Sequence, residues 1–322
     1  MNKLQLSMMR VPYDFYPATS SHVMRVTGYT NARVTRAYLQ ELCLEGYLNR
    51  LRMKMVSSLG AGASIYYGTR KGRELLASEF GEQYLHACIQ TPNWQHAPHW
   101  LGCTDIKIIF RQSEAIQTQV KICPWLQEWD TVNPHDPPEK HARMYTEFAG
   151  GKILCKPDSG FALRSGPHAK GFVIEYDRQT TALSAICAGK NPGYMELART
   201  KGHLRFFPGA ADTFSILSVS LKPGRRDLLR KAMKTWLDGQ AEKCRKEANA
   251  AKALSFVSAM KLWKFAAMSE LTPETALHGA IWYPVEGDAA PLVKTPVAAN
   301  AGDGGGPQSG PVVHPPRTLV RT

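Results

Sequence analysis

The sequence predicts a mixed α/β (α+β) fold, in which a small helical N-terminal unit with a hairpin precedes a larger α/β core. The chain has 322 residues, a length typical of two domains, and 43% of them are hydrophobic, which is enough for ordinary globular cores. Helical patterns followed by two β-rich runs fill residues 1–85, whereas strand-like runs alternate with helical segments over residues 95–222. We expect a basic helical segment (223–268) and a disordered tail (286–322) to complete the chain.

The first 85 residues predict helices, then a hairpin and a closing helix. Gly28-Tyr29 is a turn signal, Gly46 ends a helix, and Thr30 and Thr69 are residue types that cap helix starts. The expected elements are a helix at Ala18–Val26, a helix from Thr30 to Glu45, a strand at Arg50–Val56, a strand at Ile65–Tyr67 and a helix at Arg70–Phe80.

This order of elements, with the segment L-x-x-L-x-x-x-G-Y-L-x-R at Leu39–Arg50, resembles the winged helix-turn-helix family. The second helix of that motif enters the major groove, and the wing meets phosphates. The resemblance therefore implies that double-stranded DNA is the partner. The residues implied at the bases are Thr30, Asn31, Arg33 and Arg36, and those implied at the phosphates are Arg50, Arg52 and Lys54. The alternative is a protein-interaction module whose charges are merely solvated.

The distribution of charge favours a polyanionic partner. Lys and Arg number 40 against 27 acids, a net charge of +13. The excess lies in two blocks, residues 1–75 and residues 220–265, and the rest of the chain is slightly acidic. A binding surface at one or both blocks explains this pattern better than uniform solubilising charge does.

The middle of the chain predicts strands separated by helical pieces, with a proline-rich loop at 133–140. The expected elements are a helix or strand at Asp105–Phe110, another around Val120–Trp125, strands at Gly160–Leu163 and Phe172–Asp177, a helix at Thr181–Ala188, and strands at Leu204–Phe207 and Phe214–Val219.

Four acids in this region predict a metal site: Glu128, Asp158, Glu175 and Asp177. Glu175 and Asp177 are two apart on one strand and so share a face, and a hairpin would bring Asp158 beside them. Carboxylate oxygens are ligands for Mg²⁺ or Mn²⁺, which could activate water against a phosphodiester. We predict Asp158, Glu175 and Asp177 as catalytic residues, and Glu128, Asp158 and Glu175 as metal ligands.

The Pro157-Asp158 pair followed by Glu175 resembles the PD-(D/E)xK nuclease superfamily, whose core is of the restriction-endonuclease type. Asp177 occupies the position of that motif's lysine, so catalysis would need a substitute, for which Lys190 and Lys170 are candidates. The alternative is an inert arrangement in which Glu175 and Asp177 pair with Arg164 and Arg178.

The order of the motifs along the chain resembles the replication-relaxation family of plasmid and mobile-element proteins. The motifs are a winged helix, His99-x-Leu101 with Asp105, Trp125-x-x-Glu128, Pro-Asp and E-x-D-R-x-T from Glu175. This resemblance covers residues 15–220 and implies DNA binding in plasmid or mobile-element replication and DNA relaxation. A Mg²⁺-dependent nickase and a winged-helix regulator with an inactive nuclease-like domain are the alternatives.

The C-terminal helical segment, the cysteines and two histidines complete the sequence-based expectations. The helical segment predicts a helix from Arg225 to about Met268, for which a break at Ala248–Ala253 is the alternative because this stretch has few apolar anchors. Its basic face would either contact phosphate or be solvated. The seven cysteines form no CxxC pair, and no apolar run is long enough for a membrane span, so we expect a cytoplasmic protein without membrane contact. His96 and His99 lack a third ligand nearby in sequence, so we interpret them as structural. Besides DNA, the candidate partners are a second copy of the chain, which would form a homodimer, or replication and mobilisation proteins.

Overall fold

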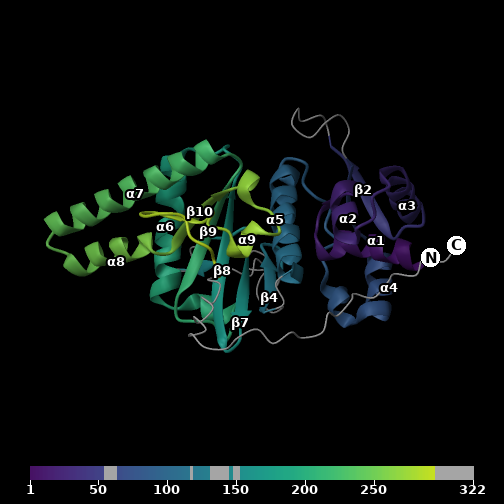
Figure 1. Cartoon of the computed structure of the whole chain (residues 1–322), viewed down its shortest axis with the longest axis horizontal. Helices are drawn as coiled ribbons and strands as arrows, with labels where there is room; N and C mark the ends of the chain where they lie inside the picture. Colours follow the sequence, from purple (N-terminus) through teal and green to yellow (C-terminus); the bar gives the residue numbers. More distant parts are fainter. Residues whose placement is uncertain (54–63, 117–118, 131–144, 148–152, 294–322) are drawn as a thin grey trace, which may run out of the picture.

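The computed structural model describes residues 1–53, 64–116, 119–130, 145–147 and 153–293. These residues form a mixed α/β structure, which confirms the predicted fold class. An N-terminal helical unit lies at one end, a six-stranded sheet lies in the middle, and two long helices extend from the other end (Figure 1). None of the helices in this part of the chain is both long enough and apolar enough to cross a membrane.

The N-terminal unit packs helices against a small antiparallel sheet with the strand order β1-β3-β2. Met9, Leu39 and Tyr66 are among the side chains buried in its core. The elements are α1 (Lys3–Asp14), β1 (Ala18–Thr19), α2 (Ser20–Thr27), α3 (Ala32–Leu44), β2 (Leu48–Arg52), β3 (Ser64–Gly68), α4 (Arg70–Phe80) and the 3₁₀ helix η1 (Glu82–His86).

The ends of these helices correct one predicted cap and confirm another. Asn31, not Thr30, caps α3, because the Asn31 side-chain oxygen accepts hydrogen bonds from two backbone N–H groups of the first turn. Thr69 caps α4 as predicted and accepts from the N–H of Gly72 at 3.1 Å. The structure also contains helix α1, which the sequence did not predict. The predicted strand to Val56 is described only to Arg52, and positions 54–56 lie outside the described residues.

The central sheet has the strand order β11-β10-β9-β8-β7-β4, with β8, β9 and β10 parallel and the other pairs antiparallel. The main elements are α5 (Ala97–Ile116), β4 (Val120–Gln127), β7 (Ser159–Ser165), β8 (His168–Asp177), α6 (Leu183–Arg199), β9 (Phe214–Ser220), α7 (Pro223–Lys246), α8 (Ala250–Met260), β10 (Trp263–Ala267), α9 (Thr275–His278) and β11 (Tyr283–Pro284). A separate short pair is formed by β5 (Thr146–Glu147) and β6 (Ile153–Cys155).

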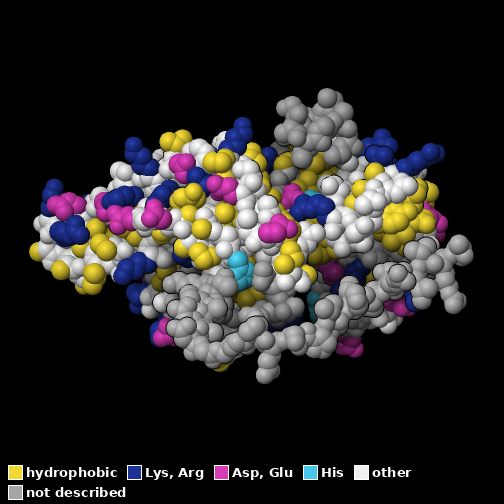
Figure 2. All heavy atoms as spheres, viewed as in Figure 1, with side chains coloured by type: hydrophobic (Ala, Val, Ile, Leu, Met, Phe, Trp, Pro, Cys, Tyr) yellow, Lys and Arg dark blue, Asp and Glu magenta, His cyan; other side chains and the backbone are white. Residues whose placement is uncertain are grey.

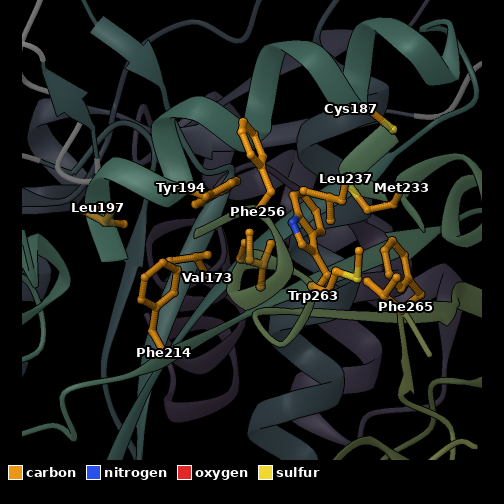
Figure 3. Packing of buried hydrophobic residues seen from close by; sticks show 14 of the residues in the cluster. Val173, Cys187, Tyr194, Leu197, Phe214, Met233, Leu237, Phe256, Trp263 and Phe265 are labelled. Carbon is orange, nitrogen blue, oxygen red and sulfur yellow. The ribbon is translucent and has the colours of Figure 1, made fainter. Parts of the chain in front are cut away.

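Helices cover both faces of this sheet because its strands alternate between two apolar cores. Val173 and Phe214 face α6, α7 and α8, where Tyr194 and Trp263 belong to the same cluster (Figure 3). On the opposite face, Ile174 and its neighbours pack against α5 and α9. The site-bearing hairpin β7–β8 therefore lies in the middle of a three-layer structure.

The C-terminal part differs from the sequence-based expectation in three ways. The predicted strand at Leu204–Phe207 is instead a 3₁₀ helix, η3 (Gly202–Arg205). The helix predicted to reach Met268 ends at Lys246, beside the break expected as the alternative at Ala248–Ala253. Ala248 adopts a left-handed conformation (φ 56°) there, and Asn249 caps a second helix, α8. Residues 263–267 form a strand of the sheet, since α7 and α8 together connect β9 to its parallel neighbour β10.

The first residues of the predicted disordered tail are ordered instead. Ala290 forms a β-bridge with Trp282, and the backbone N–H of Val293 donates to the carbonyl of Leu277 at 2.9 Å. Residues 286–293 are therefore ordered against the core, and the rest of the predicted tail lies outside the described residues.

Candidate functional site

Asp158 and Glu175 meet at the open end of the β7–β8 hairpin. Asp158 directly precedes β7, and its backbone N–H donates to the carbonyl of Ile174 at 3.1 Å, so the ladder of the hairpin extends to this residue. The N–H of Tyr176 in turn donates to Asp158 Oδ2 at 2.7 Å. The sequence predicts that a hairpin places these two acids together, and the structure brings them together in this way.

Glu175 is held by two side chains of helix α6. Lys190 Nζ lies 2.8 Å from Glu175 Oε2, and the Tyr194 hydroxyl donates to Glu175 Oε1. Burial and the nearby charge of Asp158 raise the pKa of Glu175 to about 7, although Lys190 opposes the rise. Of the two candidate lysines named from the sequence, Lys190 is therefore the one that contacts this carboxylate directly.

Asp158 contacts His99 of helix α5, with 3.1 Å between Nε2 and Oδ1. Burial favours the neutral carboxyl, but His99 and Lys190 outweigh it and hold the pKa of Asp158 below its ordinary value. Burial likewise opposes the imidazolium, yet Asp158, Glu128 and Glu175 raise the pKa of His99. An acid and a base thus stabilise each other's charged forms at the centre of the site.

The other two predicted acids are tied to different partners. Arg225 of α7 binds Asp177 at 2.6 Å, and the Asp177 side chain is only 8% exposed. Glu128 follows β4 and accepts a hydrogen bond from the Trp100 indole, and its pKa is raised by burial and by Asp158. Asp177 lines the same cavity as Glu175, whereas Glu128 lines a neighbouring one.

The alternative ion pairs expected from the sequence are not those found. Arg164 donates to the carbonyl of Pro208, and Glu175 and Asp177 pair with Lys190 and Arg225 instead. Lys170, the other candidate lysine, lies five residues before Glu175 on β8, with its ammonium over the Phe172 ring.

These groups line a cavity of about 530 Å³ between β8, α5 and α6. Its charged and polar lining combines the acids with basic groups, a composition suited to a phosphate-bearing ligand with a bound cation. The lining includes His99, Lys156, Asp158, Glu175, Asp177, Arg178 and Lys190.

A protein-family model described as replication-relaxation matches residues 11–209, which is more than half of the chain. The chain belongs to the replication-relaxation family. This membership associates the protein with replication. A search of curated proteins and a search of solved structures each found no match.

Asp158 and Glu175 of this replication-relaxation protein offer the type of donor that a divalent cation binds. Both are carboxylates, the oxygen ligands that Mg²⁺ and Mn²⁺ prefer. The ligand atoms of His99, Cys103 and Asp158 also lie within 4.8 Å of one another. Burial raises the pKa of the Cys103 thiol well above its ordinary value. Asp158 and Glu175 would hold the ion, with His99 at its edge.

Sequence reasoning gave His99 a structural role, whereas the structure places it against Asp158. It also omitted Tyr194. The sequence spacing could have indicated the site roles of both His99 and Tyr194. His99 and Cys103 are four residues apart on α5, and Lys190 and Tyr194 are four residues apart on α6. Residues at this spacing share one helix face, so each pair points to a common place.

The predicted DNA-facing residues occupy the exposed start of α3 and the exposed strand β2. Thr30, Asn31, Arg33 and Arg36 are exposed, as are Arg50 and Arg52, whereas Lys54 lies outside the described residues. Burial raises the pKa of the Tyr66 hydroxyl, and the charges of Arg50 and Arg36 oppose this rise, so both guanidinium groups lie near Tyr66. The helix and the strand therefore present positive charge together.

Proposed function

We propose that this protein binds double-stranded DNA in plasmid or mobile-element replication, with its N-terminal unit acting as a winged helix. The observation that carries the proposal is the set of exposed arginines on α3 and β2. Within the described residues, Arg33, Arg36, Arg50 and Arg52 form no ion pair, so their charge is available to a polyanion. In this proposal Arg33 and Arg36 would contact base edges, and Arg50 and Arg52 would contact phosphates.

Binding to a labelled duplex, followed by fluorescence anisotropy at several salt concentrations, tests this proposal. The double variant Arg33→Ala/Arg36→Ala should weaken binding by about 1–3 kcal/mol for each base that the shortened side chains no longer reach. The affinity of the parent protein should also fall steeply with salt, because phosphate contacts release counterions.

The matched control removes two arginines that the structure pairs within the protein. Arg199 is bound to Glu196 and Arg245 to Glu242, both on exposed helix surfaces far along the chain. Arg199→Ala/Arg245→Ala changes the net charge by the same amount and should leave duplex affinity nearly unchanged. An equal weakening of binding in the two double variants would refute a specific role for α3.

The convergence of two acids and a lysine favours a second function, metal-dependent cleavage of the bound DNA. A bound Mg²⁺ or Mn²⁺ would supply an activated water and stabilise charge on the phosphate. Asp158 and Glu175 would hold the ion, and Lys190 would place a positive charge beside the reacting phosphate. His99 keeps Asp158 ionised and so ready to bind a cation.

Incubation of supercoiled plasmid with Mg²⁺ or Mn²⁺ tests cleavage, and calorimetric titration with Mn²⁺ tests metal binding separately. Asp158→Asn should abolish nicking and weaken Mn²⁺ binding, whereas Lys190→Met should abolish nicking and leave Mn²⁺ binding in place. If the parent protein does not nick plasmid but still binds duplex, the core acts as a docking platform in a DNA-binding regulator.

A further inference from the structure

A second cavity, of about 590 Å³, adjoins the acidic cavity and has a different lining. The two cavities share His99, Arg178 and Thr180. The far wall of the second one is aromatic, formed by His96 and Trp100, with Glu128 beside them. A group that enters this space therefore lies next to the place proposed for phosphodiester chemistry.

The aromatic wall is held rigidly from behind. The Trp100 ring packs against Tyr16 and Trp129 at centroid distances of 6.1 and 5.8 Å, and its indole N–H donates to Glu128. His96 stacks on Trp100 with 29° between the ring planes and is itself exposed. Fixed aromatic rings at an open polar cavity are a surface on which a nucleobase can stack.

Arg178 lies at the boundary of the two cavities, directly after strand β8. It makes no ion pair with any described residue, in contrast to Arg225, which pairs with Asp177. A guanidinium group with free donors is suited to bind a phosphate in two-point fashion. The boundary thus offers a phosphate contact between an aromatic wall and an acidic pocket.

We propose that this second cavity binds an unpaired nucleotide of DNA, with the base against His96 and Trp100 and its phosphate at Arg178. The proposal deepens the proposed function and rests on it, because it assumes that the acidic cavity acts on DNA. A base inside an intact duplex is stacked on both sides and cannot reach such a wall without being extruded. The substrate class that fits is therefore single-stranded DNA, or a duplex with an unpaired base.

The test compares binding of a labelled DNA single strand and of the corresponding duplex, by fluorescence anisotropy in the absence of divalent metal. His96→Ala and Arg178→Gln should each weaken binding of the single strand by about tenfold and leave duplex binding nearly unchanged. The matched control is Trp94→Ala, which removes an aromatic ring that is 58% exposed and does not line the cavity. It should leave both affinities unchanged.

The outcomes separate this proposal from the proposed function. Loss of duplex binding in Arg33→Ala/Arg36→Ala, with single-strand binding retained, would support two distinct DNA contacts. A parent protein that binds no duplex would refute the proposed winged-helix function, while the single-strand measurements still test the cavity. Unchanged single-strand affinity in both His96→Ala and Arg178→Gln, or an equal weakening in Trp94→Ala, would overturn the cavity assignment.

Discussion

The geometry of the acidic site depends on a glycine in helix α5. A Cβ atom built at Gly102 would lie 2.0 Å from Cε1 of Tyr176, far inside van der Waals contact. Tyr176 follows Glu175 on β8, and its N–H donates to Asp158. Gly102 therefore allows α5, which carries His99, to approach the end of the strand that carries the acids.

The substitution Gly102→Ala should destabilise the protein by about 1–3 kcal/mol, since the ring of Tyr176 must move to make room. The displacement should also disturb the contact of Asp158 with His99, so Mn²⁺ affinity measured by calorimetry should fall. Thermal unfolding followed by circular dichroism measures the first effect.

Gly239→Ala is the matched control, because Gly239 is also helical and a Cβ there would meet nothing within 4 Å. In an open helix position, alanine should stabilise the fold by about 0.5–1 kcal/mol relative to glycine. If both variants were stabilised, the close approach at Gly102 would be unimportant.

At the scale of elements, three arginines at the start of helix α7 tie it to the rest of the protein. Arg225 binds Asp177, and Arg226 binds Asp227 and Glu270. Arg230 donates to backbone carbonyls of Pro284, Val285 and Gly287. Figure 2 shows acidic side chains interspersed with the basic ones over this helix. Three basic side chains of the 220–265 block therefore pair with acids outside it, whereas Lys231, Lys243 and Lys246 are exposed and form no ion pair with a described residue.

Arg226→Ala should destabilise the C-terminal segment, because Arg226 is buried, pairs with Glu270 and lies over the Tyr283 ring with its Cζ 4.1 Å from the ring centroid. We expect a decrease of about 2 kcal/mol in the free energy of unfolding, as for a hydrogen-bonded charge left without its partner. Limited proteolysis should cut more rapidly near residues 283–293. Arg245→Ala removes an exposed ion pair on the same helix and should cost less than about 0.5 kcal/mol. Equal effects of the two variants would contradict this role.

Local signals in the sequence predicted some elements well and others poorly. Thr69 correctly predicted the start of helix α4, and the apolar run at 172–177 correctly predicted strand β8, because a helix cap and a β-rich pattern are local properties. The lack of apolar anchors at Ala248–Ala253 indicated the break after α7, but the helix predicted to continue to Met268 was wrong, because the place of β10 in the sheet depends on its pairing with the distant strand β9. The site also has a part that local signals predict and a part that they do not. The hairpin predicts that Asp158 meets Glu175, whereas the contact of His99 with Asp158 depends on how α5 packs against the strand ends.

At the scale of the whole molecule, α5 joins the N-terminal unit to the sheet. Ile108 of α5 is buried in the N-terminal core, whereas Phe110, two residues further on, is buried against the sheet. The Thr104 hydroxyl donates to carbonyl groups of the segment before β1, the nearest being that of Pro17 at 3.1 Å. Figure 1 shows this helix between the two parts, so the position of the proposed DNA-binding unit relative to the acidic cavity depends on it.

The polar contact at this junction is centred on Asp105. His22 Nε2 lies 3.2 Å from Asp105 Oδ1, and Arg25 of the same helix, α2, binds the same oxygen. Burial opposes ionisation, but His22 and Arg25 outweigh it and hold the pKa of Asp105 below its ordinary value. A carboxyl whose pKa is lower in the folded state stabilises that state at pH values above its unfolded pKa, and this contribution is lost as the pH falls through the folded pKa.

Asp105→Asn should therefore destabilise the protein at pH 7 by about 1–3 kcal/mol, because a charged acceptor of two partners becomes neutral. The difference between the variant and the parent should be constant down to about pH 4 and shrink below it, where the parent carboxyl also becomes protonated. Urea unfolding at a series of pH values measures this difference. Asp212→Asn, which removes an exposed acid paired with Lys201, is the control and should show little effect at any pH. A pH-independent difference would instead assign the destabilisation to packing and not to charge.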